Sequence, residues 1–178
     1  MSKKEHLKSE GLQKVINLKS SMNKGSTPIL IKHFPNLNPV NRPSVKIPVN
    51  LNPNWVAGFV DAEGCFFIST TKSKLYKTGH RIQLNFNIVQ HYRDILLMKK
   101  FVKYFNCGEI YETSDHVTFV VTKLSDIEEK ILPFFNKYPL QGFKQLDYVK
   151  FCRVTALMKE KAHLTVKGLE EIMKIKTG

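Results

Sequence analysis

Polar and apolar positions alternate most regularly over residues 81–88, which read polar then apolar without a break. Alternation with a period of two is typical of a β-strand buried on one face. A second β-rich run covers residues 65–71, and Gly79 with its polar neighbours indicates a turn between the two runs. The pattern therefore predicts a β-hairpin in the middle of the chain.

Apolar residues at helical spacing surround this hairpin. Residues 53–63 suit a short helix, and Ser125-x-x-Glu128 has the spacing of a capping box at a helix start. The other predicted elements are a helix over 94–105, a hairpin of 109–113 and 116–122 turning at Ser114–Asp115, and helices over 145–159 and 165–176. The order is αββαββα with helical additions. Because helices follow hairpins, the predicted fold class is α+β with an antiparallel sheet.

The segment over residues 25–52 is rich in Pro and Asn. Prolines at this density exclude a long helix or a central strand, so we expect an extended linker here. The region is also basic, because residues 1–50 contain nine Lys and Arg against two Glu. We therefore separate this linker from a main domain over residues 53–178.

The two flanks of the chain resemble each other. Residues 4–19 align with residues 161–176 at a constant offset of 157, with six identities, and share the pattern His-Leu-x3-Gly-Leu. The apolar residues Val15, Ile16 and Leu18 correspond to Ile172, Met173 and Ile175. Duplication explains the shared register, and the alternative is two unrelated Lys-rich amphipathic helices. Under duplication, residues 1–24 are an amphipathic helix from the tail of a preceding repeat.

The charge balance narrows the class of partner. The chain has 28 Lys and Arg against 15 Asp and Glu, a formal net charge of +13. Such an excess favours a polyanionic partner, above all nucleic acid. The alternatives are simple solubility and a compartment whose proteins are generally basic.

Three cysteines lie far apart without a CxxC pair, which argues against a disulfide framework or a zinc site and favours a reducing compartment. No apolar run approaches the roughly 18 residues of a membrane helix, and the N-terminus has no apolar stretch of a secretory signal. The N-terminus also has acids and no Arg, unlike a transit peptide. We expect a soluble intracellular protein with no membrane partner and no targeting signal.

The predicted helix over 53–63 carries small residues on one face. Gly58 and Ala62 lie four residues apart with Ala57 beside them, and small residues allow another helix to approach closely. A mid-helix Gly costs about 1 kcal/mol relative to Ala, so it usually has a packing reason. Asp61 and Glu63 end the helix, where the macrodipole disfavours acids and a cation would compensate. On spacing alone, a metal site and a solvated helix end are equally supported.

Residues 56–64, Val-Ala-Gly-Phe-Val-Asp-Ala-Glu-Gly, resemble the nine-residue LAGLIDADG motif in the form common among organellar intron-encoded enzymes. Further blocks resemble the same family in order: Cys65-Phe66-Phe67, Ile88-Val89-Gln90-His91, Phe119-Val120-Val121-Thr122-Lys123, Gly142-Phe143-Lys144 with Asp147-Tyr148, and His163-Leu164-Thr165 with Gly168-Leu169. The resemblance to LAGLIDADG homing endonucleases covers residues 50–178 nearly end to end. It implies a saddle-shaped antiparallel sheet on DNA, with helices stacked on its other face.

The resemblance also implies roles for three polar residues. Glu63 matches the acid that binds the divalent metal at the scissile phosphates. Gln90 and Lys144 match residues that order the attacking water and stabilise the phosphorane charge. The alternatives are that Gln90 only ends a strand and that Lys144 is one of many exposed lysines.

Hydrolysis of a phosphodiester by this route uses divalent cations, Mg²⁺ or Mn²⁺, held by hard oxygen ligands. One Glu63 is too few ligands, so the site needs a second repeat. Gly58 and Ala62 would pack across the axis between two repeats. The resemblance places Asp61 in this interface, bonding within it, and Ala57 lies on the same face.

The alternation over 81–88 also predicts a DNA-reading surface. If the apolar positions face the helices, Arg81, Gln83, Asn85 and Asn87 face outward, and Arg, Gln and Asn pair with purine edges in the major groove. The other expected DNA-binding residues are Ser69, Thr71, Lys72, Lys74, Lys77, Tyr111, Thr113, Thr118 and Thr122. No acid lies between Glu63 and Asp94. The alternative is an ordinary solvated sheet face.

These features predict a site-specific, metal-dependent double-strand DNA endonuclease that is active only when paired with a second repeat. The second repeat is either another copy of the chain or an N-terminal half. The alternatives are an intron RNA maturase, with intron RNA as partner, and an inactive DNA-binding remnant of a truncated reading frame. We expect a mitochondrial, fungal origin.

Overall fold

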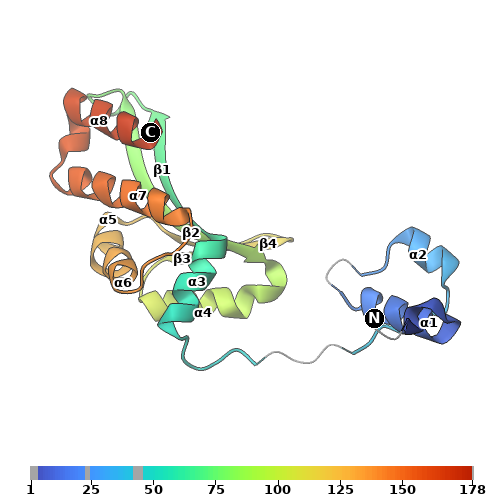
Figure 1. Cartoon of the computed structure of the whole chain (residues 1–178). Helices are drawn as coiled ribbons and strands as arrows, with labels where there is room; N and C mark the ends of the chain where they lie inside the picture. The colour runs from blue at the N-terminus through green and yellow to red at the C-terminus, as the bar shows by residue number, and fades with distance from the viewer. Residues whose placement is uncertain (1–3, 23–24, 42–45, 178) are drawn as a thin grey trace. The chain divides into compact units, whose positions relative to one another are not determined.

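The computed structural model describes residues 4–22, 25–41 and 46–177. The chain divides into two compact units, Met1–Lys46 and Ile47–Gly178, coloured from blue to red along the chain in Figure 1. The first unit contains η1 (Glu5–Leu7), α1 (Ser9–Ser20) and α2 (Pro28–His33). Helix α1 is amphipathic and buries Ile16.

Helix α2 corrects the expectation that residues 25–52 are extended throughout. Pro28 occupies its first turn, where the missing N–H has no helical partner to lose. The Thr27 side chain caps the turn by accepting a hydrogen bond from Leu30 N at 3.3 Å. A short helix thus fits between prolines that exclude only a long one.

The second unit begins before the predicted boundary at Pro53. Leu51 is buried in its core, and the Lys100 ammonium donates a hydrogen bond to the Pro48 carbonyl. The last residues of the predicted linker therefore belong to the domain that follows them.

The second unit contains two β-hairpins, each followed by helices. Its elements are α3 (Pro53–Glu63), β1 (Gly64–Lys72), β2 (His80–His91), η2 (Tyr92–Asp94), α4 (Ile95–Phe105), β3 (Glu109–Glu112), β4 (His116–Val121), α5 (Leu124–Asp126), the π-helical η3 (Ile127–Ile131), α6 (Leu132–Lys137), α7 (Lys144–Lys159), η4 (Ala162–Leu164) and α8 (Val166–Thr177). The predicted αββαββα order is confirmed. No helix in the described part of the chain is long and apolar enough to cross a membrane.

The four strands form one antiparallel sheet in the order β1-β2-β4-β3. Strand β2 has the predicted alternation: Ile82, Leu84, Phe86 and Ile88 are buried, and the residues between them are exposed or half-buried. Helices α7 and α8 lie beside the curved β1–β2 hairpin in Figure 1. One face of the sheet is therefore covered and the other is open.

Aromatic side chains fill the core between sheet and helices. The Phe66 ring of β1 stacks on Phe86 of β2 with centroids 5.0 Å apart, and it meets Phe151 of α7 edge-on at 5.4 Å. Each such burial contributes about 1.5–3 kcal/mol, so the strands are held firmly against the helices. This packing decides which residues of β1 and β2 point to the open face.

The helix near Ser125 does not begin with the predicted capping box. Its first residue is Leu124, Lys123 is the N-cap, and no side chain caps it. Glu128 instead pairs with Lys159 of α7. Burial of the isoleucines in η3 sets the local register, so the Ser-x-x-Glu spacing was misleading here.

Candidate active site and nucleic-acid interface

Helix α3 brings Glu63 directly to the sheet. The Asn52 side chain caps its start by accepting from Asn54 N at 2.9 Å. At its other end the chain passes from Glu63 through Gly64 straight into β1. A Cβ at Gly64 would lie 2.6 Å from Val60 Cγ1, so this tight exit requires glycine. The backbone of Glu63 is therefore held at a junction without a loop.

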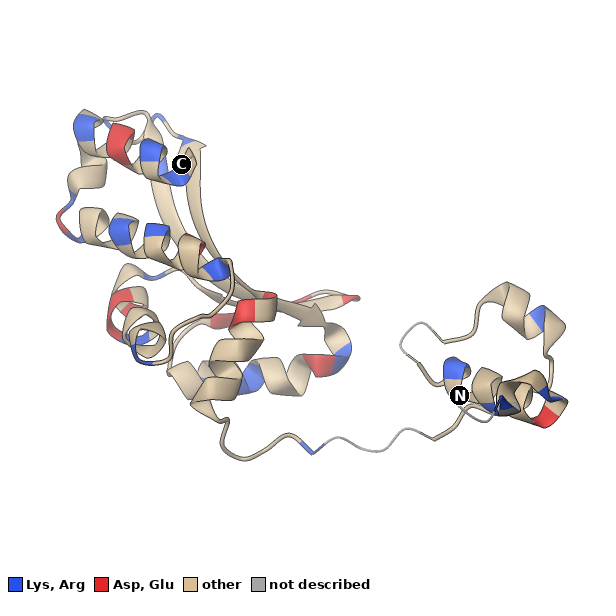
Figure 2. Cartoon of the chain, viewed as in Figure 1, with Lys and Arg blue, Asp and Glu red and all other residues tan. Residues whose placement is uncertain are grey.

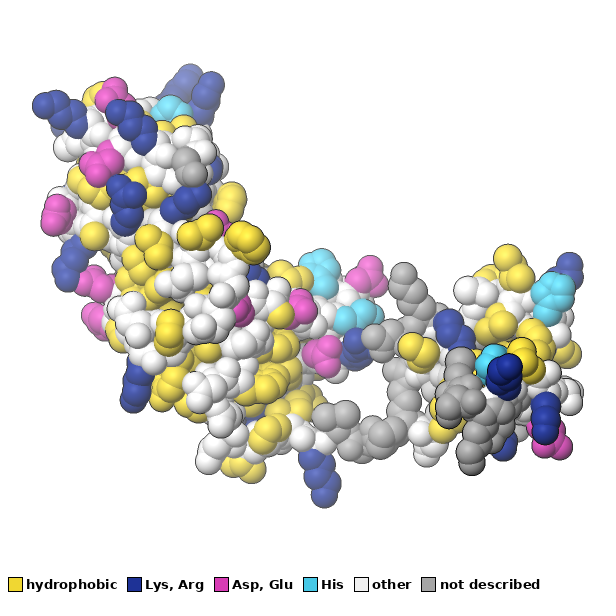
Figure 3. Space-filling model, in the orientation of Figure 1, with side chains coloured by type: hydrophobic (Ala, Val, Ile, Leu, Met, Phe, Trp, Pro, Cys, Tyr) yellow, Lys and Arg dark blue, Asp and Glu magenta, His cyan; other side chains and the backbone are white. Residues whose placement is uncertain are grey.

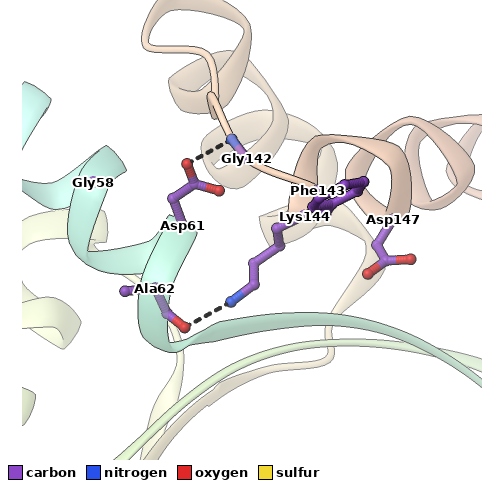
Figure 4. A pocket seen from close by; sticks show the side chains of 7 residues that line it. All are labelled: Gly58, Asp61, Ala62, Gly142, Phe143, Lys144 and Asp147. Atoms are coloured by element: carbon purple, nitrogen blue, oxygen red, sulfur yellow. Dashed lines mark hydrogen bonds between the residues drawn. The ribbon is translucent and has the colours of Figure 1, made fainter.

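Lys144 lies beside this junction. It is the first residue of α7, and its Nζ donates a hydrogen bond to the Ala62 carbonyl at 3.1 Å (Figure 4). The last carbonyls of a helix lack helical partners and carry partial negative charge, so a lysine is favourable there. The structure thus places the Lys144 ammonium at the end of α3, on the carbonyl of Ala62, the residue that precedes Glu63.

Asp61 anchors the loop that leads into α7. Its Oδ2 accepts hydrogen bonds from Gln141 N at 3.0 Å and Gly142 N at 2.8 Å. A Cβ at Gly142 would lie 3.0 Å from Asp61 Oδ1, so the loop approaches the carboxylate closely. Asp61 therefore bonds to a loop of its own domain, where the sequence predicted a bond within an interface between repeats.

One side of α3 is open. Gly58 and Ala62 are exposed, and no atom of the described residues lies within 4 Å of a Cβ built on Gly58. Ala57, the third small residue of the motif, is only 7% exposed and packs within its own domain. Gly58 and Ala62 thus form an open strip along which another helix can approach. Ala57 is not part of that strip, because the helical turn directs it inward.

The open strip borders a hollow that continues to the first turn of α7 (Figure 4). Its lining residues are Gly58, Asp61, Ala62, Gly142, Phe143, Lys144 and Asp147. Phe143 is 91% exposed and Leu146, one turn further, is 60% exposed. Figure 3 shows hydrophobic side chains gathered on the surface of this domain. Sequence reasoning missed this apolar extension, although the spacing of Phe143 and Leu146 along α7 was a usable signal.

Gln90 reaches the same end of the hairpin as Glu63. Gly64 pairs with Ile88 in the β1–β2 register, so Gln90 extends β2 past the point where α3 joins β1. Its side chain is half-buried, on the same side of β2 as Ile88. The fold therefore brings Glu63, Gln90 and Lys144 to one end of the hairpin.

The charges around this end also act on a thiol. Cys65 follows Gly64 on β1, and burial raises the pKa of its thiol. Lys144 opposes this rise in pKa, and Asp147 adds to it. The thiol is therefore neutral near pH 7.

A divalent cation needs more oxygen ligands than this domain supplies. No three His, Cys, Asp or Glu side chains of the described residues lie together as a metal site. Glu63 is exposed, and no described residue is hydrogen-bonded or ion-paired to its carboxylate. A free carboxylate is the hard oxygen ligand that Mg²⁺ prefers. The residues present fit one half of a cation site.

Most of the predicted DNA-binding residues lie on the open face of the sheet. The register places Arg81 opposite Thr71 and Gln83 opposite Ser69, with Asn85 and Asn87 following on the same side. Tyr111 and Thr118 pair with each other on the second hairpin. Arg81 and Thr71 are exposed, and the others on β1 and β2 are half-buried between their neighbours. These side chains form one continuous polar surface.

The tip of the β1–β2 hairpin is basic. Lys72 ends β1, and Lys74 and Lys77 lie in the turn, where all three are exposed. Figure 2 shows basic residues on this domain, with the acids of α3 at the opposite end of the hairpin. A basic tip is suited to contacts with phosphates.

The second hairpin departs from the prediction in three places. Glu109, which was not expected at the open face, accepts a hydrogen bond from Tyr111 Oη at 2.9 Å and thereby raises the pKa of Tyr111. Thr113 lies in the turn, where its Oγ1 accepts from His116 N at 3.1 Å. Thr122 follows the last residue of β4 and is exposed. The hydroxyl of Thr113 is thus used by the turn.

Comparison with known proteins agrees with this geometry. A family model described as LAGLIDADG endonuclease matches residues 56–155. The chain belongs to this family. Its motif helix is α3, and the matched region runs from that helix through the sheet into α7.

Several relatives and solved structures resemble this LAGLIDADG chain. "Probable intron-encoded endonuclease 3" of Neurospora crassa is 41% identical over 97% of this chain and 33% of its own length. "Probable intron-encoded endonuclease 2" of the same fungus is 40% identical over 100% of this chain and 40% of its own length.

Among solved structures, meganuclease I-SmaMI bound to uncleaveable DNA has a TM-score of 0.91 at 41% identity, covering 100% of this chain and 60% of its own. The I-LtrWI LAGLIDADG homing endonuclease bound to target DNA has a TM-score of 0.86 at 42% identity, covering 98% and 59%. The chain thus spans between a third and three fifths of the length of these proteins.

Proposed function

We propose that the chain is one repeat of a site-specific endonuclease that cleaves double-stranded DNA when paired with a second LAGLIDADG repeat. The observation that carries the proposal is the end of α3. There the free Glu63 carboxylate and the Lys144 ammonium flank a helix whose outer face, at Gly58 and Ala62, is open. A second α3 on that face would bring a second carboxylate close to Glu63.

Each side chain at this end has a distinct task in phosphodiester hydrolysis. Two facing Glu63 carboxylates would hold Mg²⁺ or Mn²⁺, which when bound would supply a more acidic water and a polarised phosphoryl oxygen. The Lys144 ammonium has three N–H donors, and one of them binds the Ala62 carbonyl. The two remaining donors are available for a phosphate oxygen, where they stabilise negative charge in the transition state. Gln90 orients a water molecule through its amide.

The open sheet face reads the duplex. Arg81, Gln83, Asn85 and Asn87 project from a rigid strand and can pair with base edges in the major groove. The lysines at the hairpin tip are flexible cations that neutralise phosphates without selecting sequence. Specificity and affinity therefore come from different parts of the same hairpin.

The relatives support this proposal in three ways. I-SmaMI and I-LtrWI were solved on DNA, and I-SmaMI was also solved on an uncleaved target in the presence of calcium ions. The matched proteins are longer than this chain, which is consistent with a second domain. Fungal relatives are named for introns of ND4 and cox1, which supports a mitochondrial origin.

The test is Glu63→Gln. A binding-site selection in Ca²⁺ first identifies a preferred duplex, and cleavage of that duplex is then measured in Mg²⁺. We expect the variant to bind the duplex as the parent does and to cleave none of it, because the amide cannot hold the cation. The matched control is Glu129→Gln, an exposed acid of the π-helical turn, which should cleave normally.

Cleavage by Glu63→Gln at the parental rate removes this carboxylate from the mechanism. Selection of folded intron RNA in preference to every duplex overturns the DNA endonuclease altogether. Sedimentation of the DNA complex reports the number of chains that cleave together.

A further inference from the structure

One acid lies on the open face of the sheet. The register places Glu109 of β3 opposite Val120 of β4, and Val120 in turn lies opposite Asn87 of β2. Residues directly opposite each other in a sheet point to the same side, so Glu109 shares the face of Asn87. Its side chain is exposed there. Among the outward positions of the four strands, as far as the structure describes them, Glu109 is the only Asp or Glu.

A neighbouring phenol holds this carboxylate in place. Tyr111, two residues further along the same side of β3, donates a hydrogen bond from its Oη to Glu109 Oε2 at 2.9 Å. This bond and the charge of Glu109 raise the pKa of Tyr111, so the phenol keeps its proton at neutral pH and stays a donor. No Lys or Arg of the described residues pairs with Glu109. The carboxylate therefore has an unneutralised charge, a fixed Oε2 and an Oε1 that can accept a bond.

A carboxylate at this place opposes DNA unless it meets a donor. The excess of Lys and Arg attracts the chain to phosphates, and a like charge on the contact surface weakens binding to every duplex. Glu112, on the same strand, provides the contrast. It lies opposite the buried Val117, on the helix side of the sheet, and pairs with Lys99 of α4 at 3.0 Å. Only Glu109 presents an unpaired acid to the surface that reads bases.

The four bases differ in what their major-groove edges offer to a carboxylate. Guanine presents two acceptors, N7 and O6, and thymine presents the acceptor O4 beside a methyl group. Adenine has a donor at N6 with the acceptor N7 next to it, whereas cytosine has the N4 amino donor alone. A carboxylate can therefore bond to cytosine without facing an acceptor, and the acceptors of the other three bases repel it.

We propose that Glu109 selects a cytosine in the target duplex, accepting a hydrogen bond from the N4 amino group at Oε1, and that Tyr111 is the positioning residue for this carboxylate. This rests on the proposed function and deepens it by naming one base. Arg81 and Gln83 bring donors to the same face, and Glu109 adds the acceptor that they lack. Much of its selectivity comes from repulsion of the wrong bases.

The test is Glu109→Gln in the full chain. Binding-site selection in Ca²⁺ is run on the parent and the variant, and affinities are then measured on duplexes that differ only at the affected base pair. Because a Gln amide pairs with N6 and N7 of adenine, we expect one cytosine of the preferred site to become adenine, with relative affinities changing by about tenfold. The matched control is Glu112→Gln, which removes the same charge on the helix side of the sheet and should keep the cytosine.

Tyr111→Phe tests the positioning role. It should keep cytosine preferred by a smaller factor, and it should have no effect on that base pair in a Glu109→Ala background, where no carboxylate remains to be positioned. A parent that selects one duplex and a Glu109→Gln variant that selects the same bases overturn this inference alone. An equal change of base with Glu112→Gln overturns it as well. A parent that selects no duplex contradicts the proposed function, and this inference with it.

Discussion

Asp61→Ala removes the acceptor that fastens the α7 loop to α3. The carboxylate accepts two backbone N–H groups, from Gln141 at 3.0 Å and from Gly142 at 2.8 Å. Hydrogen bonds to a charged acceptor contribute about 1.5–3 kcal/mol each in a protected site. Both amides are exposed here and water replaces part of the loss, so we expect the pair to account for about 2 kcal/mol.

This loss has two measurable effects. For a domain of this size, about 2 kcal/mol corresponds to a fall in Tm of about 6–10 °C. Asp61→Asn keeps one acceptor oxygen and should lose about half as much. Release of the loop also frees Lys144 from the Ala62 carbonyl, so cleavage should fall more steeply than DNA affinity. Circular dichroism follows thermal unfolding for the Tm and urea unfolding for the free energy, at concentrations where the chain does not associate.

The matched control is Asp147→Asn, an exposed acid that lines the same hollow and, among the described residues, accepts no backbone hydrogen bond from the loop. It should change the unfolding free energy little. If Asp61→Ala destabilises the isolated chain no more than this control does, the loop is not held by Asp61. That outcome is expected if Asp61 acts only between two repeats. Asp61→Ala would then weaken the pairing of repeats without changing the stability of the isolated chain.

Further substitutions distinguish residues that act in cleavage, in base recognition, in phosphate contacts and in the pairing of repeats. Lys144→Ala should abolish single-turnover cleavage while binding persists, because the lost ammonium acts on transition-state charge. Arg81→Ala or Gln83→Ala should weaken binding to the preferred duplex by about 1–3 kcal/mol and relax the base preference in a binding-site selection. An unchanged base preference would contradict recognition of bases by the open face of the sheet. Lys74→Ala should weaken all duplexes alike and lower the salt slope of binding by about one. Gly58→Leu should block pairing in sedimentation yet leave the Tm of the single repeat unchanged or slightly higher, since nothing described lies within 4 Å of the added Cβ.

The sequence periodicity predicted the hairpins well because every second residue of a strand must be apolar when one face of the sheet is buried. Strand β2 alternates since Phe86 and its buried neighbours must face the helices, and a shift by one residue would expose all of them. The same constraint placed Arg81 and Gln83 on the open face. Glu63 and Lys144 were identified through the resemblance of short motifs, and the fold brings both to the end of α3.

Features that depend on distant contacts were not predictable from local pattern. The hydrogen bonds of Asp61 reach Gln141 and Gly142, which are 80 and 81 residues away along the chain, and no spacing rule connects them. The start of α5 follows burial of isoleucines in a π-helical turn, which overrode the local signal at Ser125. Helix α2 was missed because its proline was counted as a breaker when it occupies the first turn.

Under the proposed function, the pairing register of β2 constrains how the DNA-reading surface of this protein can change. Gln90 lies at one end of the strand and Arg81 near the other, and they point to opposite faces of the sheet. Side chains alternate between the two faces, so this arrangement depends on the number of residues between them. A one-residue deletion between them would turn the outward polar side chains of β2 into the core and bring the apolar side chains to the open face. Such an indel is lethal to the fold, whereas substitutions at the outward positions leave the core untouched. If the open face reads DNA as proposed, its specificity is therefore expected to change through substitutions at these outward positions, without a change in the length of β2.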